Sequence, residues 1–300
     1  MQIPFVTVDV FTDRKFGGNP LAVLPEATAL NGAQMQAIAG EFNLAETTFV
    51  LPPQDAMHTA QVRIFTPRAE LPFAGHPNIG TAFVVANEAA RQGQAPADPI
   101  IFEEKAGLVR LSLLKQGGSV IGARLAPPQA LQRGDDLDTE IVAAACSLTA
   151  NDIKTANHHP CIASCGIPLA FVELKTRAVL ASARPRADVF TKHLPAERIT
   201  GVLMYVHDQS DGFDLQVRMF APLYGVPEDP ATGSGNVALA GLLASLRPEA
   251  DVTLNLRIAQ GVDMGRPSLL EASAEKRAGK VVGMAIGGRC IPMMRGVLEV

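Results

Sequence analysis

The feature that most constrains this sequence is an internal repeat: three short blocks occur twice, in the same order. Residues 18–23 resemble 166–171, residues 63–67 resemble 218–222, and residues 70–82 resemble 228–240. The copies are separated by 148, 155 and 158 residues, a steady growth that small insertions into a duplicated segment would produce. One such match could also arise from limited turn chemistry, because Gly and Pro recur in turns. Three matches in order favour a duplication, which predicts two similar domains and not a solenoid.

The length agrees with this interpretation, since 300 residues correspond to about two domains. We expect residues 1–118 to form the first domain, with a C-terminal strand at 290–300 as a candidate to complete it. Residues 119–289 would form the second. Gly117 and Gly118, followed by Pro127 and Pro128, interrupt the pattern in the boundary region.

Each half combines strand patterns with one unusually apolar helix. In the first half, the spacing of apolar residues predicts strands at 5–11, 21–24, 48–51 and 61–65 and helices at 31–43 and 79–90. In the second half it predicts helices at 139–147 and 237–246 and strands at 169–174, 202–206 and 215–220. The predicted fold class is α+β, with two pseudo-symmetric domains, each a mostly antiparallel sheet wrapped around a central apolar helix.

Composition excludes several classes of partner. The formal net charge is −4, which does not suit a face for nucleic acid or an anionic membrane. There is no Trp and there are two Tyr, so stacking platforms for single-stranded nucleic acid are not expected. No apolar run approaches the ~20 residues of a membrane span. Four Cys do not make a disulfide framework, and we expect free thiols and a cytoplasmic location.

The third repeat block leads into an apolar helix in both halves. Gly75 and His76 in one copy, and Gly233, Ser234 and Gly235 in the other, would present backbone N–H groups at a helix start. Helix starts bind anions through these N–H groups and the helix dipole. The alternative is plain capping, in which polar side chains satisfy these groups locally. Because the motif is duplicated, we favour a shared cleft that binds a small anion.

Two carboxylates lie beside these helix starts. Asp229 precedes Gly233 by four residues and could act as an acid or base once partly desolvated, or it could be an ordinary turn residue before Pro230. Glu46 enters an apolar strand, where an unpaired buried charge is costly. From the residues alone, a surface cap or salt-bridge partner is an equally open interpretation of Glu46.

Two other kinds of site were weighed against this one. His158, His159, Cys161 and Cys165 have a metal-like spacing, but no Cys falls at the duplicated helix starts, so we expect neither a metal site nor a two-thiol mechanism. Residues 233–238 fit the dinucleotide pattern G-x-G-x-x-A, but residues 228–232 separate that pattern from the preceding strand. A dinucleotide-dependent oxidoreductase is therefore the weakest of the alternatives.

The sequence closely resembles the PhzF-like family of phenazine-biosynthesis isomerase-like proteins, which are related in fold to diaminopimelate epimerase. The matching segments span nearly the whole chain: residues 16–23, 43–50, 63–67, 70–77, 228–234 and 260–268. The resemblance implies an active site in the cleft between two similar domains. It also implies that Glu46 is the proton shuttle and that His76, Asp229 and Ser234 are the other catalytic positions.

We therefore expect a cofactor-independent isomerase or epimerase acting on a small carboxylate-bearing metabolite. Gly75, His76, Gly233, Ser234 and Gly235 would bind that anion, and the resemblance makes a homodimer plausible. The alternative is a catalytically silent ligand-binding protein of the same fold. Asn78 departs from the Thr that relatives often carry, and the connection at 182–198, which has no assigned counterpart, is a candidate to shape the pocket.

Overall fold

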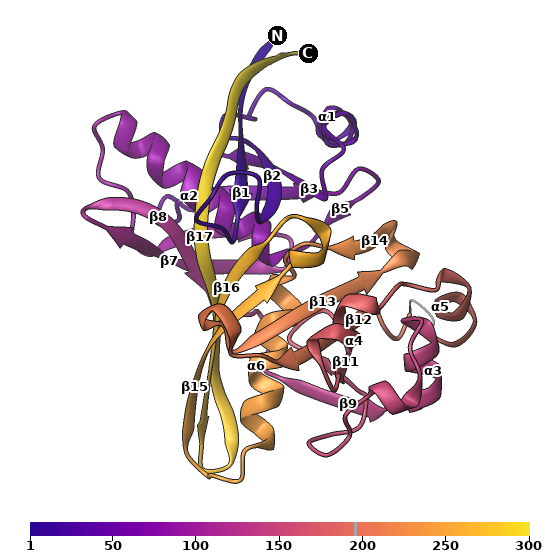
Figure 1. The fold of residues 1–300 in the computed structure, drawn as a ribbon. Coiled ribbons are helices and arrows are strands. Elements are labelled where there is room, and N and C mark those ends of the chain that lie inside the picture. Colours follow the sequence, from indigo (N-terminus) through magenta and orange to yellow (C-terminus); the bar gives the residue numbers. More distant parts are fainter. Residues whose placement is uncertain (195–196) are drawn as a thin grey trace. The chain divides into compact units, whose positions relative to one another are not determined.

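The structure, a computed structural model, describes residues 1–194 and 197–300. The chain forms two compact units, Met1–Ala126 with Gly287–Val300, and Pro127–Ile286 (Figure 1). The first unit therefore extends past residue 118, and the sequence-based boundary placed one strand wrongly. That strand, β8 (Ser119–Leu125), pairs with β7 (Gly107–Gln116) of the first unit. The last strand, β17 (Lys280–Glu299), begins in the second unit and ends in the first.

The first unit is a mostly antiparallel sheet with two helices. Besides β7, β8 and the end of β17, it contains β1 (Gln2–Val10), β2 (Asn19–Leu24), β3 (Glu46–Leu51), β4 (Ala60–Phe65), β5 (Glu70–Leu71), β6 (Ile100–Glu104), α1 (Gly32–Phe42) and α2 (Gly75–Arg91). β2 runs parallel to β3, and β4 parallel to β6. β17 pairs with both β1 and β8, so the sheet closes on itself. α2 packs against β1, β2, β3, β7 and β8, inside this closed sheet.

The second unit contains more helices. Its strands are β9 (Gln132–Asp136), β10 (Cys161–Ser164), β11 (Leu169–Glu173), β12 (Gly201–His207), β13 (Leu215–Ala221), β14 (Val226–Asp229), β15 (Val252–Gln260), β16 (Ser268–Arg277) and the start of β17. Its α-helices are α3 (Thr139–Ala145), α4 (Arg177–Ser182), α5 (Ala187–His193) and α6 (Gly233–Leu246). Short 3-10 turns occupy Ala150–Asp152, Ser210–Gly212, Pro222–Tyr224 and Val262–Met264.

The strand pairings of the second unit repeat those of the first. β10 and β11 are antiparallel as β1 and β2 are, β11 and β12 are parallel as β2 and β3 are, and β13 and β15 are parallel as β4 and β6 are. α6 packs against β10, β15 and β16. The α+β fold class, with a mostly antiparallel sheet around one apolar helix in each unit, is thus confirmed.

The central helices begin at the duplicated Gly motifs, as the sequence predicts. α2 starts at Gly75, ahead of the apolar run at 79–90, and its polar first turn is buried as well as the apolar turns that follow it. α4 and α5 lie in the long connection that had no predicted structure, and Pro195 and Ala196 of that connection fall outside the described residues.

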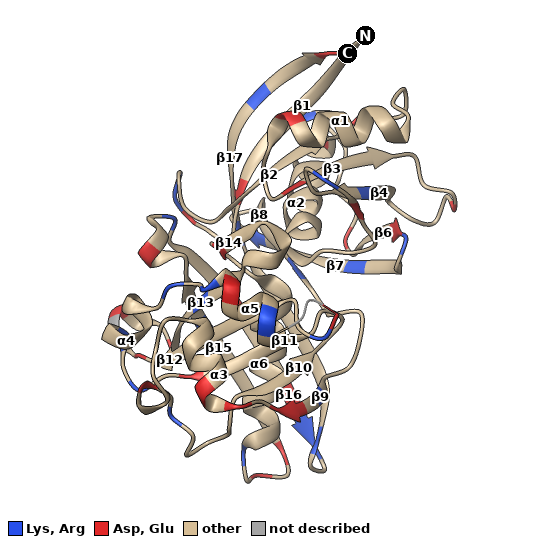
Figure 2. Cartoon of the chain, turned by 90° about the vertical axis from the view of Figure 1, so that its right-hand side faces the viewer, with Lys and Arg blue, Asp and Glu red and all other residues tan. Residues whose placement is uncertain are grey.

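Positive and negative side chains are mixed along the chain. Figure 2 shows Lys and Arg interspersed with Asp and Glu in both units. Within residues 1–194 and 197–300, no helix combines the length and the apolar character needed to cross a membrane.

Each central helix has a glycine packed tightly against the strands. A Cβ atom on Gly80, in the second turn of α2, would lie 2.6 Å from Leu21 Cδ2 and 2.8 Å from Val10 Cγ2. A Cβ atom on Gly235, in the first turn of α6, would lie 2.6 Å from Leu203 Cδ1. The glycines therefore allow both helices to sit close against the strands near their N-terminal ends.

This packing gives a test of the fold. Gly80→Ala should lower the free energy of unfolding by roughly 1–3 kcal/mol, because a methyl group would be forced into a filled core. Gly40→Ala in α1 is the matched control, since its Cβ would meet only Pro67 O at 3.7 Å. It should be neutral or stabilising by about 0.5–1 kcal/mol. Urea titrations of both variants measure the difference, and equal effects would contradict the close packing of α2.

Candidate functional site

The start of α2 presents buried polar groups without a side-chain cap. Its N-cap residue is Ala74, and no described side chain accepts from the first turn as a cap. By contrast, Asn31 caps α1 through a complete capping box. Gly75 and His76 are the first two helical residues, both buried, and Pro77 is the third. Plain capping by a side chain, the alternative considered from the sequence, does not occur here.

His76 and Glu46 lie in contact at this helix start. Glu46 is the first residue of β3, and its Oε2 lies 3.2 Å from His76 Nε2, without the geometry of a hydrogen bond. On the other side of the ring, Asn19 Nδ2 lies 3.4 Å from His76 Nδ1. Burial lowers the pKa of His76 to about 3, so the imidazole is neutral at pH 7. A neutral ring carries one donor and one acceptor nitrogen, as a proton relay requires.

The start of α6 has the same character in the second unit. Its N-cap residue is Thr232, whose side chain makes no capping hydrogen bond. Instead, Thr232 Oγ1 donates to Asp229 Oδ2 at 2.6 Å. Gly233 and Gly235 are buried, while Ser234 between them is partly exposed. The structure thus brings Asp229 to the helix start that carries Ser234.

One residue that the sequence-based assignment of roles missed holds this second helix start together. Gln260, the last residue of β15, donates through Nε2 to Asp229 O and to Thr232 Oγ1. Its Oε1 accepts from Thr232 N at 3.1 Å and from Asn236 Nδ2 at 2.7 Å. Gln260 is fully buried, so all four hydrogen bonds are shielded from water. The signal was present, because residue 260 opens one of the matching family segments.

The duplicated blocks also place a matching arginine–glutamate pair before each helix. Arg63 Nε and Nη2 donate to the two oxygens of Glu70 at 2.8 Å, and Arg218 makes the same two bonds to Glu228 at 2.8 Å. Bidentate pairs of this kind fix geometry as well as charge. Glu228 directly precedes Asp229, so the pair anchors the segment that carries this carboxylate.

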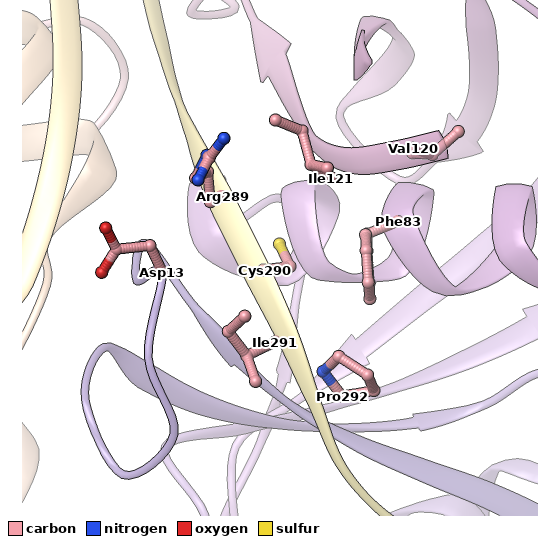
Figure 3. Close-up of a pocket in the computed structure, with 8 residues that line it drawn as sticks. All are labelled: Asp13, Phe83, Val120, Ile121, Arg289, Cys290, Ile291 and Pro292. Carbon is pink, nitrogen blue, oxygen red and sulfur yellow. The ribbon is translucent and has the colours of Figure 1, made fainter. Parts of the chain in front are cut away.

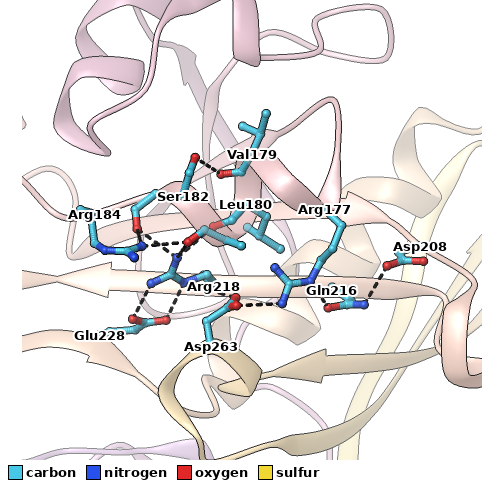
Figure 4. A network of polar contacts seen from close by, with 12 residues as sticks. Arg177, Val179, Leu180, Ser182, Arg184, Asp208, Gln216, Arg218, Glu228 and Asp263 are labelled. Atoms are coloured by element: carbon cyan, nitrogen blue, oxygen red, sulfur yellow. Dashed lines mark hydrogen bonds and ion pairs between the residues drawn. The ribbon is translucent and has the colours of Figure 1, made fainter.

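The second of these pairs is more extensively connected (Figure 4). Arg218 is 4% exposed, and its Nη1 donates to the carbonyl oxygens of Leu180, Ala181 and Ala183 at the end of α4. A further ion pair joins Arg177 of α4 to Asp263 at 2.9 Å. Through its bonds to these carbonyl oxygens, Arg218 holds the end of α4 as well as Glu228.

The cysteines lie elsewhere and are free and buried. Burial raises the pKa of Cys146 and of Cys165 to about 12, so these thiols stay protonated at pH 7. Both ring nitrogens of His158 make hydrogen bonds of 2.7 Å, Nδ1 with His159 O and Nε2 with Tyr205 Oη. In the part of the chain that the structure describes, no group of three or more His, Cys, Asp or Glu side chains is arranged to hold a metal ion.

A small pocket of the first unit is distinct from the helix start. It has a volume of about 220 Å³ and is lined by Phe83 of α2, by β8 and by residues 289–292 of β17 (Figure 3). Asp13 and Arg289 lie at its edge, and the Cys290 thiol faces it. Neither Glu46 nor His76 lines this pocket, so it is not the predicted site.

Comparison with known proteins agrees with the family resemblance. The model of the phenazine biosynthesis-like protein family, PhzC-PhzF, matches residues 8–296. An uncharacterised isomerase of Mesorhizobium japonicum is 35% identical, with 98% of each chain covered. The trans-2,3-dihydro-3-hydroxyanthranilate isomerase of Pseudomonas fluorescens is 34% identical, again with 98% of each chain covered.

Solved structures extend the likeness to the fold. A Bacillus anthracis protein of the PhzF family superposes with a TM-score of 0.88 at 22% identity, covering 100% of both chains. A hydroxyproline epimerase of Agrobacterium vitis superposes with a TM-score of 0.63 at 15% identity, covering 99% of this chain and 92% of its own. The fold is therefore of the epimerase-like type. Since the family pattern covers nearly every element from β1 to β17, and the relatives align over almost their full length, this chain belongs to the phenazine biosynthesis-like protein family.

Proposed function

We propose that this protein is an isomerase that moves a proton between carbon atoms of a small carboxylate-bearing metabolite, using its own side chains and no cofactor. The observation that carries the proposal is the contact between Glu46 and the neutral, buried His76 at an uncapped helix start. An acid–base pair beside free backbone donors suits the abstraction and return of a proton next to a bound anion.

The chemistry divides between the two groups. Glu46, as the carboxylate, removes a proton from carbon and returns it at another carbon of the same substrate. His76 can accept or pass on that proton, because a neutral imidazole has both a donor and an acceptor nitrogen. Negative charge develops on the substrate when the proton leaves, and backbone N–H groups at a helix start stabilise such charge.

The residues of the second unit complete the proposal. Asp229, held by Thr232 and beside Gln260, is the candidate acid–base group of this unit. Ser234, with the backbone of Gly233 and Gly235, would bind a carboxylate at the start of α6, as the backbone of Gly75 would at the start of α2. The absence of a side-chain cap on α2 and α6 supports this role, since it leaves first-turn donors for a ligand.

The curated relatives suggest the substrate class to test first. Several are trans-2,3-dihydro-3-hydroxyanthranilate isomerases, at 33% and 34% identity over almost the whole chain. That substrate carries a carboxylate and would undergo a proton shift, as the site requires. A protein that has kept the fold and lost the chemistry would bind this ligand without exchanging its protons.

The first test concerns the proton shuttle. Glu46→Gln should lower kcat for trans-2,3-dihydro-3-hydroxyanthranilate by ~10²–10⁴-fold, because the amide cannot take a proton from carbon. KM should change little, since the amide has nearly the same shape. Product formation and deuterium uptake from D₂O, both followed by NMR, measure the effect.

Glu41→Gln on the exposed face of α1 is the matched control for this test. Full activity of Glu46→Gln would refute the mechanism. Binding by the unmodified protein with no deuterium uptake would show a silent binding protein.

A second test concerns anion binding. Ser234→Ala should raise KM by roughly 10-fold with kcat less affected, because a hydrogen bond to a charged group contributes about 1.5–3 kcal/mol. Ser245→Ala is a control on the same helix, where the hydroxyl donates to Leu242 O instead. Steady-state kinetics on both variants make the comparison, and an unchanged KM for Ser234→Ala would remove Ser234 from the binding site.

A further inference from the structure

Glu104 is a buried carboxyl that the proposed chemistry does not use. It is the last residue of β6, and both of its carboxyl oxygens are buried without a completed hydrogen bond among the described residues. The side chain of Asn78, in the first turn of α2, is its polar neighbour. A carboxylate buried in this way would be an uncompensated charge, which is costly.

The duplication assigns Glu104 a counterpart in the second unit. The repeat aligns Ala60 of β4 with Leu215 of β13, because Arg63 and Arg218 match. Ala60 pairs with Phe102, and Leu215 pairs with Ile258, both in parallel register. Two residues further along each partner strand stand Glu104 and Gln260, and each is the last residue of its strand.

The two helix starts confirm this equivalence. Asn78 Nδ2 donates to Ala74 O at 3.0 Å, and Asn236 Nδ2 donates to Thr232 O at 2.9 Å. Each asparagine is therefore at the same place in its helix and bonds back to its N-cap residue. Asn236 also donates to Gln260 Oε1 at 2.7 Å, and Asn78 is the corresponding polar neighbour of Glu104.

We propose that Glu104 is a positioning residue that fixes the first turn of α2, and through it His76, as Gln260 fixes the first turn of α6. This role requires the protonated form, because a neutral carboxylic acid combines an acceptor oxygen with an O–H donor, as the glutamine amide combines an acceptor oxygen with N–H donors, whereas a carboxylate can only accept. The proposal deepens the proposed function and rests on it only in the part that concerns His76.

The surroundings favour the protonated form. Burial raises the pKa of Glu104 to about 8, and the Asn78 amide partly opposes this rise. On neighbouring elements, Arg63 of β4 pairs with Glu70 of β5, Arg110 of β7 is exposed, and His76 of α2 is neutral at pH 7.

On β6 itself, the neighbours of Glu104 are engaged elsewhere. Glu103 accepts from the backbone N–H groups of Gln54 and Asp55 and pairs with His58. Lys105 pairs with Glu70. Glu103 is itself an acid and Lys105 is paired with Glu70, so neither neighbour neutralises a charge on Glu104.

The first experiment needs no substrate. An unfolded glutamate ionises near pH 4.5, while Glu104 in the folded protein ionises near pH 8, so the wild type loses stability as pH rises through this window. Glu104→Gln cannot ionise. Its urea midpoint should exceed that of the wild type by a difference that widens from about pH 5 to about pH 8 and then stays constant.

Glu103→Gln is the matched control on the neighbouring residue. Hydrogen bonds from the backbone of Gln54 and Asp55 lower the pKa of Glu103. Glu103→Gln should therefore not raise the urea midpoint above that of the wild type at alkaline pH. A difference between Glu104→Gln and wild type that does not change with pH would overturn the proposal. So would a Glu104→Gln protein that is less stable than the wild type at pH 8.

The second experiment tests the action through His76 and uses trans-2,3-dihydro-3-hydroxyanthranilate. Under conditions where circular dichroism shows every variant folded, Glu104→Ala should lower kcat about 10-fold or more, as expected when a buried polar partner is lost. Glu104→Gln should restore kcat and keep it at pH 8–9, where wild-type activity declines. Equal alkaline decline in wild type and Glu104→Gln would overturn the positioning role.

The two proposals can fail separately. If Glu46→Gln stays active, the mechanism fails, while the pH-dependent stability of Glu104→Gln still tests the protonated carboxyl. If Glu46→Gln is inactive and Glu104→Ala has wild-type kcat, the mechanism stands and the positioning role of Glu104 is refuted.

Discussion

The burial of two polar helix starts is the constraint on which the rest of this structure depends. The N-terminal parts of α2 and α6 sit close against their strands because Gly80, in the second turn of α2, and Gly235, in the first turn of α6, have no Cβ atom. Buried N–H groups at a helix start must be satisfied by side chains, water or ligand, and neither helix has a side-chain cap. The fold therefore fixes these turns from outside, through groups on neighbouring strands, and leaves the backbone donors themselves available. An anion is the ligand that such donors fit.

The two units share one arrangement of strands around a central helix, and the proposed chemistry depends on the side chains that differ between them. The arginine–glutamate pairs and the back-bonding asparagines are the same in both units. His76 in one copy stands where Ser234 stands in the other, and Glu104 stands where Gln260 stands. A neutral imidazole beside a carboxylate suits proton transfer, whereas a hydroxyl suits binding. The two units thus share one architecture and carry different side chains at the starts of their central helices.

Much of the fold could be predicted from periodicity and turns. The apolar face of α1, with Met35, Ile38 and Ala39 buried, follows from the helical spacing of these residues. β8 was assigned to the wrong unit because Gly117 and Gly118 were interpreted as an interruption between the domains, whereas they are the turn of the hairpin that joins β7 to β8. The start of α2 at Gly75 follows from the Gly-His-Pro motif, whereas the burial of its polar residues, such as Asn78, depends on the surrounding strands. Roles for Gln260 and Glu104 could not be predicted either, because the residues that they contact are distant in sequence.

By itself the sequence determined the duplication, the α+β class, the family and the residue types at each helix start, because these are properties of local pattern and of matched motifs. Only the tertiary structure decided the states of those residues. His76 is neutral because the closed sheet removes water from it, and the carboxyl of Glu46 lies 3.2 Å away because β3 begins beside the start of α2. Burial and strand register are set by contacts between segments far apart in the chain. They, and not the motif, determine which groups hold a proton.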